Sequence, residues 1–317
     1  MSEIATTIGK LAPVALVFGG GVVFARRKII GAEVSKAFSD FAFLFAIPCY
    51  LAGALYSSDL GRLFDPRAIA AYLVTALAGT LVVGFWSRRV TGADSRGIAL
   101  RIMAGVQVNT TYFAIPVFVL LFGDAAPIFP IILLQVCVLT VVVIAVMEFG
   151  AGQDDPGGQR PIAAAVRGIR AALLTPIVVA CYLGIGANVA EVPVPQWLLD
   201  TLAFAGNAAA PIALFAIGLH LGGSGLRLRA AARDEYALIA FKCLVFPLLA
   251  LLVCKYLFGI RGAWLTYSVL IAAMPSPQNL FIFAQRYETD IDLAASIVAK
   301  TSLVALLLLP GWLLLAR

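Results

Sequence analysis

Long apolar stretches separated by short polar connections follow one another along the whole chain. Each stretch holds roughly 20 residues, which as a helix cross a hydrocarbon core of about 30 Å. We predict ten membrane-spanning helices, at residues 8–25, 38–56, 67–87, 98–122, 127–148, 171–190, 197–220, 235–257, 262–285 and 293–315. The predicted fold class is therefore all-α and integral to the membrane. Since no connection is long enough for a soluble domain, residues 1–317 form a single membrane unit.

The composition agrees with this prediction and adds a topology. Of the 317 residues, 62% are hydrophobic and 13% are charged, and the mean hydropathy is +0.99, which is outside the range of soluble globular domains. Fifteen Lys and Arg residues lie in the loops after odd-numbered stretches, six lie on the opposite side and two lie within stretches. This bias predicts an inner-membrane protein with both termini outside the cytoplasm. It explains the net charge of +6, so we predict no nucleic-acid partner.

Landmarks recur between the two halves of the chain. Pro13 and Pro176 are separated by 163 positions, and so are Pro48 and Pro211. A constant separation of this kind predicts two inverted repeats of five helices each. The predicted division is a first repeat at residues 1–148, a cytoplasmic linker at 149–170 and a second repeat at 171–317.

Two stretches at corresponding places are interrupted by polar residues and proline. Asn109 to Pro116 interrupts the fourth stretch, and Pro275 to Asn279 interrupts the ninth. Proline removes a backbone donor, so the freed backbone groups need partners within the protein or in a cavity. Paired interruptions of this kind mark the substrate site of many secondary transporters. The predicted substrate-binding residues are Asn109, Thr110, Thr111, Tyr112, Pro116, Pro275, Ser276, Pro277, Gln278 and Asn279.

Two lysines lie near the middle of apolar stretches. A charge at the centre of a membrane helix costs about 2.5–3.5 kcal/mol on insertion scales, so Lys242 and Lys300 are candidates for charge or coupling roles. The alternative is that each lysine extends its stem to the membrane surface. Gln135 stands 165 positions before Lys300, and the same separation relates Asn109 to Met274. We therefore expect Gln135 to act with Lys300. We interpret Arg101, about two turns before the first interruption, as an anchor at the membrane surface.

One glycine pair predicts a close helix contact. Gly218 and Gly222 have the G-x-x-x-G spacing that lets two membrane helices approach each other. His220, the only histidine, lies between them and is a candidate proton relay.

The chain resembles the auxin efflux carrier family, whose bacterial members include malonate and other organic-acid permeases. The resemblance lies in Phe-Ala-Phe-Leu-Phe-Ala-Ile-Pro at 41–48, in Asn109 to Pro116 with the following Leu-Phe-Gly at 121–123, and in Pro275 to Asn279 with Arg286-Tyr287. It implies a fold related to bile-acid and sodium/proton carriers, with a scaffold domain and a transport domain in which broken helices four and nine cross. It also implies that Lys242 takes the place of a sodium ion and that the protein forms a homodimer.

We predict a secondary transporter that moves a small organic anion, a mono- or dicarboxylate that is malonate-like or an auxin-like weak acid. The expected mechanism is alternating access of the elevator type. An anion channel or a membrane sensor on the same fold is the alternative. Without H-E-x-x-H, G-x-S-x-G or Walker motifs, the sequence indicates no enzyme, cofactor or metal site. Coupling to protons, coupling to sodium and uniport are all left open.

Overall fold

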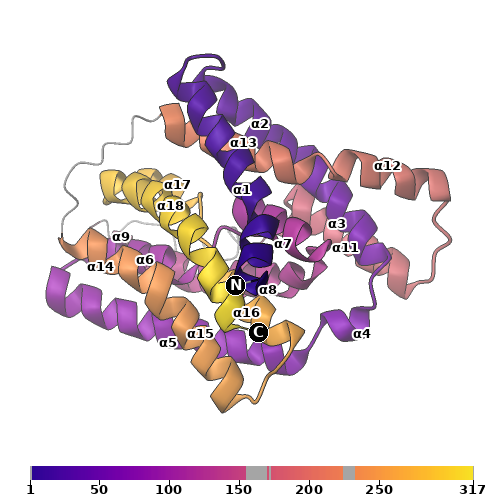
Figure 1. Ribbon diagram of the computed structural model, residues 1–317. Coiled ribbons are helices and arrows are strands. Elements are labelled where there is room, and N and C mark those ends of the chain that lie inside the picture. Colours follow the sequence, from indigo (N-terminus) through magenta and orange to yellow (C-terminus); the bar gives the residue numbers. More distant parts are fainter. Residues whose placement is uncertain (1, 155–169, 171–172, 224–232, 317) are drawn as a thin grey trace. The chain divides into compact units, whose positions relative to one another are not determined.

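The computed structural model (Figure 1) describes residues 2–154, 170, 173–223 and 233–316. Within these residues the chain forms helices and turns, with no β-strand. The all-α class predicted from the apolar stretches is confirmed for the part of the chain that is described. An α-helix suits an apolar chain in a bilayer because it satisfies its backbone hydrogen bonds within one segment.

Six helical runs in the described part of the chain are long and apolar enough to cross a membrane. They are Ser35–Tyr56, Pro66–Thr91, Ser95–Phe122, Gln196–Gly223, Asp234–Leu257 and Ile291–Leu315. Three shorter apolar helices are Ala12–Arg26, Pro176–Val189 and Ala263–Ala272. Each of these overlaps one of the predicted stretches, and the protein is an integral membrane protein. The count of ten spans stays a prediction.

The described chain divides into two compact units, and each unit draws segments from both halves of the sequence. The first consists of Met1–Asp65, Thr110–Pro130 and Leu173–Arg227. Its helices are α1 (Ser2–Arg26), η1 (Ala32–Val34), α2 (Ser35–Phe41), η2 (Ala42–Ala46), α3 (Ile47–Tyr56), α4 (Leu60–Leu63), η4 (Thr110–Ala114), α7 (Ile115–Phe122), η5 (Ala126–Ile128), α11 (Pro176–Val189), α12 (Gln196–Gly206) and α13 (Ala209–Gly223). We call this part unit 1.

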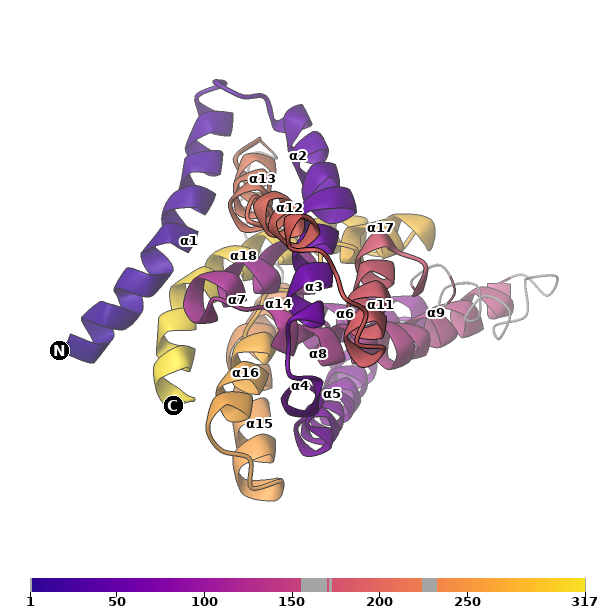
Figure 2. The same ribbon diagram turned by 90° about the vertical axis from the view of Figure 1, so that its right-hand side faces the viewer.

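Unit 2 consists of Pro66–Asn109, Ile131–Ala172 and Leu228–Arg317. Its helices are α5 (Pro66–Trp86), η3 (Ser87–Thr91), α6 (Ser95–Val106), η6 (Gln135–Leu139), α9 (Thr140–Asp154), α14 (Arg233–Ala240), η7 (Phe241–Val245), α15 (Phe246–Leu252), η8 (Val253–Leu257), α16 (Ala263–Ala272), α17 (Leu280–Arg286) and α18 (Ile291–Leu315). Helix α8 (Phe129–Leu134) joins the two units. Within unit 2, α15 and α16 pack side by side (Figure 2).

The predicted linker is only partly described. Helix α9 continues to Asp154 and so extends past the predicted start of the linker at residue 149. Residues 155–169 of the linker lie outside the described residues. The division into two sequence repeats therefore stays a prediction.

Close helix packing in unit 1 depends on glycine. A Cβ atom on Gly218 would lie 2.1 Å from the carbonyl oxygen of Phe18, and one on Gly222 would lie 2.6 Å from that of Val22. Neither position can hold a larger side chain without separating α13 from α1. The G-x-x-x-G spacing thus marks a real helix contact in this structure.

Three prolines follow wide helical turns. Pro48, Pro116 and Pro247 are each the second residue of an α-helix that continues a five-residue π-helix. A proline inside a regular helix clashes with the preceding turn and leaves one carbonyl without a donor, and the wider π turn relieves this conflict. Four residues before Pro247, the carbonyl of Cys243 accepts a hydrogen bond from Trp312 Nε1 at 3.0 Å instead.

Candidate functional site

The first interruption lies earlier than the sequence predicts. Helix α6 ends at Val106, and Gln107 has an extended conformation with φ −74° and ψ 156°. The opening covers Gln107 to Asn109, whereas the next residues form the π-helix η4. Pro116, predicted to keep the backbone open, lies within the helical run of η4 and α7, where the wide π turn before it accommodates the missing N–H. The proline therefore lies within the helical run that follows the break and is not part of the break.

The second interruption is longer and lies where it was predicted. Helix α16 ends at Ala272, and α17 begins at Leu280. The chain between them contains Pro275 and Pro277, both buried. Prolines at these positions cannot donate the N–H groups that a continuous helix would need.

Within unit 2 the two interruptions are hydrogen-bonded to each other. The N–H of Asn109 donates to the carbonyl of Pro275 at 2.9 Å. The hydroxyl of Ser276 donates to the carbonyl of Ala104, near the end of α6, at 2.7 Å. Ser276 is fully buried, so its hydroxyl joins the two segments instead of facing a cavity.

A neighbouring side chain satisfies the backbone at each interruption. The N–H of Val108 donates to Oε1 of Gln135 at 2.9 Å, and Nε2 of Gln135 donates to the carbonyl of Val108 at 3.0 Å. The amide of Gln135 thus pairs with the open chain as a peptide group would. At the second interruption, the N–H of Ser276 donates to Oγ1 of Thr301 at 3.2 Å. Sequence reasoning identified Gln135 but missed Thr301.

Lys242 belongs to η7 and is fully buried. Its side chain lies against the C-terminal end of α16. Its Nζ lies 3.5 Å from the carbonyl oxygen of Ala272 and 4.8 Å from the ring centre of Phe246. The C-terminal end of a helix carries partial negative charge, which favours a cation. No carboxylate forms an ion pair with Lys242 among the described residues. The surface-reaching alternative for Lys242 is wrong in this structure, since its side chain remains inside unit 2.

Lys300 has a different environment. Its Nζ lies 2.7 Å from Oε1 of Glu235, which also accepts a hydrogen bond from Ser296 Oγ at 2.5 Å. Both charged side chains are nearly buried, with exposed fractions of 12% for Lys300 and 8% for Glu235. Lys300 is therefore paired with a carboxylate, whereas Gln135 is paired with the backbone.

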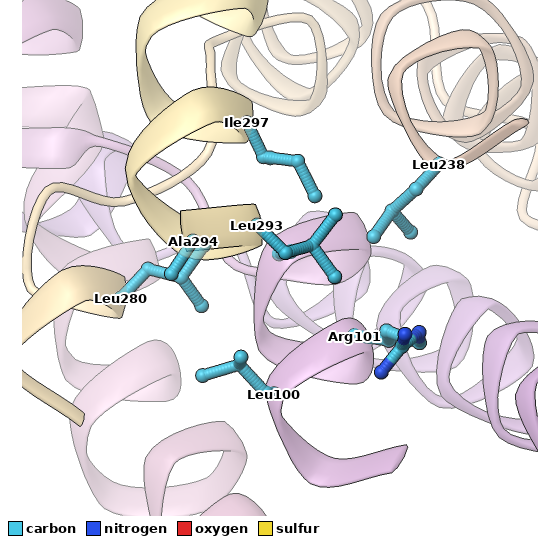
Figure 3. A pocket seen from close by; sticks show the side chains of 8 residues that line it. Leu100, Arg101, Leu238, Leu280, Leu293, Ala294 and Ile297 are labelled. Carbon is cyan, nitrogen blue, oxygen red and sulfur yellow. The ribbon is translucent and has the colours of Figure 1, made fainter. Parts of the chain in front are cut away.

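Arg101, interpreted from the sequence as an anchor at the membrane surface, is buried and paired with carboxylates. Its side chain is 9% exposed and forms ion pairs with Asp234 at 3.1 Å and with Asp290. Figure 3 shows Arg101 at the wall of a pocket whose other labelled side chains, such as Leu100 and Leu238, are apolar. The two carboxylates already neutralise the guanidinium, so this pocket is not suited to an anion. The sequence missed this network because α14 and the start of α18 meet α6 only in the folded chain.

The remaining predicted residues divide between the units. Asn109, Pro275, Ser276, Pro277, Gln278 and Asn279 lie in unit 2, and Thr110, Thr111, Tyr112 and Pro116 lie in unit 1. Gln278 is half-buried and Asn279 is exposed. In unit 1 the ring of Tyr112 stacks on that of Phe43, with centroids 5.9 Å apart. No group of three metal-binding side chains occurs among the described residues.

These features define a helical integral membrane protein with two interrupted and mutually bonded segments. Residues 6–313 match the family model described as "Membrane transport protein", and the chain belongs to this family, the auxin efflux carrier family. The membership supports a role in transport.

Two relatives agree with this assignment. The chain is 28% identical over 260 residues to a protein of Rhizobium meliloti (strain 1021) named "Putative malonate transporter", and the match covers 78% of each chain. It is 24% identical over 298 residues to an "Uncharacterized transporter" of Methanothermobacter thermautotrophicus, and this match covers 92% of each chain.

Proposed function

We propose that this protein is a secondary transporter for a small organic anion, a mono- or dicarboxylate such as malonate or an auxin-like weak acid. The observation that carries the proposal is the hydrogen bond between Asn109 and Pro275, which joins two interrupted apolar segments. Interrupted helices that meet place helix-end dipoles near one another within the membrane, where they can act on a charged substrate. The relative named as a malonate transporter favours a carboxylate.

Two matching contacts in unit 1 support the inverted repeat that this mechanism needs. A Cβ atom on Gly21 would lie 2.3 Å from the carbonyl oxygen of Phe215, and one on Gly184 would lie 2.5 Å from that of Ala52. Gly21 and Gly184 are separated by 163 positions, as are Ala52 and Phe215. This is the separation of the proline pairs, so the same contact recurs with the two halves exchanged.

In the proposed mechanism the substrate binds beside the interruptions and travels with unit 2. Asn109 and the more accessible Gln278 and Asn279, all in unit 2, are the proposed hydrogen-bond donors. The side chain of Lys242, in its protonated form, adds positive potential near the end of α16. One unit moves relative to the other to alternate access, as in an elevator-type carrier. We further propose ten spans, both termini outside the cytoplasm, an inner-membrane location and a homodimer.

Uptake by proteoliposomes tests this function. Labelled malonate should enter with saturation, and unlabelled malonate inside the vesicles should accelerate its entry. An Asn279→Ala variant should raise the KM for malonate, whereas Gln196→Ala, an exposed control in α12, should leave it unchanged. Non-saturating flux without acceleration would instead identify an anion channel. Repeating the assay with and without sodium and a proton gradient would identify the coupling ion.

A further inference from the structure

The side chain of Gln107 is buried without a hydrogen-bond partner. The residue is 1% exposed, and within the described part of the chain neither its Nε2 nor its Oε1 has a partner. Its own backbone N–H is satisfied by the carbonyl of Met103 at 3.1 Å. A buried amide group without partners is strongly unfavourable, so an additional partner is expected at this position.

A small cavity in unit 2 adjoins this amide. Its lining residues are Leu77, Thr80, Ile102, Val106, Gln107, Leu139, Val142 and Val143, and it has room for about one water molecule. Thr80 supplies the only other polar side chain. The hydroxyl of Thr80 donates to the carbonyl of Ala76 at 2.8 Å, which leaves its oxygen able to accept a hydrogen bond.

We propose that this cavity is a binding site for a single ordered water molecule, held by Gln107 and Thr80. The two ends of the amide require a guest that accepts from Nε2 and donates to Oε1, and water does both. A sodium ion would bind Oε1 but leave Nε2 without an acceptor. An apolar guest would leave both atoms without partners. The number and kind of the available groups therefore select water.

The position of this site corresponds to that of Lys242. Leu77 and Gln107 in the first half stand 165 positions before Lys242 and Ala272, the same separation that relates the two interruptions. In the second half, the Lys242 ammonium lies against the last carbonyl of α16. In the first half, the bound water occupies the matching place at the end of α6. One interruption is thus supported by the Lys242 amino group and the other by a neutral guest.

Radiolytic hydroxyl-radical labelling of the full-length protein in lipid nanodiscs tests this site without relying on transport. Radicals formed from bound water modify the adjoining side chains even when these are buried. We expect Val143, which is 1% exposed, to be labelled several-fold faster than Val269, which is 0% exposed and does not line the cavity. In a Gln107→Leu variant, labelling of Val143 should fall to the rate for Val269.

Two results would overturn the proposal. Equal labelling of Val143 and Val269 in the unmodified protein would show a dry cavity. A rise in melting temperature that is specific to sodium over N-methylglucamine chloride, and is lost in Gln107→Leu, would show that the guest is a cation. A Thr80→Val variant with a normal melting temperature provides a second test if Gln107→Leu does not fold, because it should also lower the labelling of Val143.

Discussion

The two interruptions in unit 2 solve the same structural problem in different ways. An α-helix that stops inside a membrane leaves carbonyls at its end without partners. The first interruption is three residues long, Gln107 to Asn109, and its main supporting side chain is the neutral amide of Gln135. The second, from Ala273 to Asn279, is supported by the hydroxyl of Thr301 and the ammonium of Lys242.

The hydrogen bonds at the two helix ends explain this difference. At the end of α6, the carbonyl of Met103 accepts from Gln107 N–H, and that of Ala104 accepts from the Ser276 hydroxyl. At the end of α16, backbone N–H groups reach the carbonyls of Val269 and Ile271. The last carbonyl of the helix, that of Ala272, is contacted by Lys242 Nζ at 3.5 Å. The second break therefore places a charge where the first uses neutral groups.

The largest expected effect comes from the ion pair of Lys300 with Glu235, because Lys300 precedes Thr301, which supports the second interruption. Lys300→Met would leave the nearly buried Glu235 without its cation, which should reduce stability by about 3–5 kcal/mol. Thermal unfolding of the purified protein measures this loss. The matched control is Lys36→Met, because the Lys36–Asp40 ion pair is largely exposed and should contribute little. Adding Glu235→Gln to Lys300→Met should restore much of the stability, and a double variant as unstable as the single one would contradict this account.

A comparable loss is expected at the first interruption. Gln135→Leu would leave the N–H and the carbonyl of Val108 without partners, at about 1–3 kcal/mol for each group. A Gln278→Leu variant controls for the general effect of this substitution, because Gln278 is half-buried and forms no hydrogen bond among the described residues. Thermal unfolding should distinguish the two variants. If both melt at the same temperature, the amide of Gln135 does not support the open backbone.

The sequence predicted the location of these segments better than it predicted their partners. Proline and polar residues inside apolar stretches are local signals, so the second interruption was placed correctly. The first was placed too late, because Pro116 was taken as part of the break when it lies in the helical run that follows the break. A proline is compatible with either position, and only the fold distinguishes between them.

Partners distant in the sequence were harder to predict. The burial of Arg101 depends on Asp234 and Asp290, which approach it only after α14 and α18 pack on α6. Gln135 was identified through its separation from Lys300, yet the two side chains serve different partners. A positional match between repeats indicates corresponding places in the fold, and it does not specify which hydrogen bonds form there.

Removing one hydroxyl at the second interruption should have a moderate effect. Thr301→Val keeps the shape of the side chain but removes the acceptor for the Ser276 N–H, with an expected loss of about 1–3 kcal/mol in thermal unfolding. Thr301→Ser keeps the hydroxyl and should retain most of the stability. An equal loss in both variants would indicate that packing of the methyl group, rather than the hydrogen bond, supports this segment.

Lys242→Met should have the smallest effect on stability and so separates folding from function most clearly. The ammonium is buried without a carboxylate partner among the described residues, and its nearest oxygen lies 3.5 Å away at Ala272. Removing a buried charge with such weak compensation relieves a desolvation penalty, so the melting temperature should stay unchanged or rise. Uptake of malonate should fall nonetheless, because the positive potential at the end of α16 is lost.

Lys255→Met, at an exposed position beside Tyr256, is the matched control and should change neither quantity. A large drop in melting temperature for Lys242→Met would mean that the lysine stabilises the second interruption as strongly as Gln135 stabilises the first, and the contrast between a charged and a neutral support would then concern folding rather than transport.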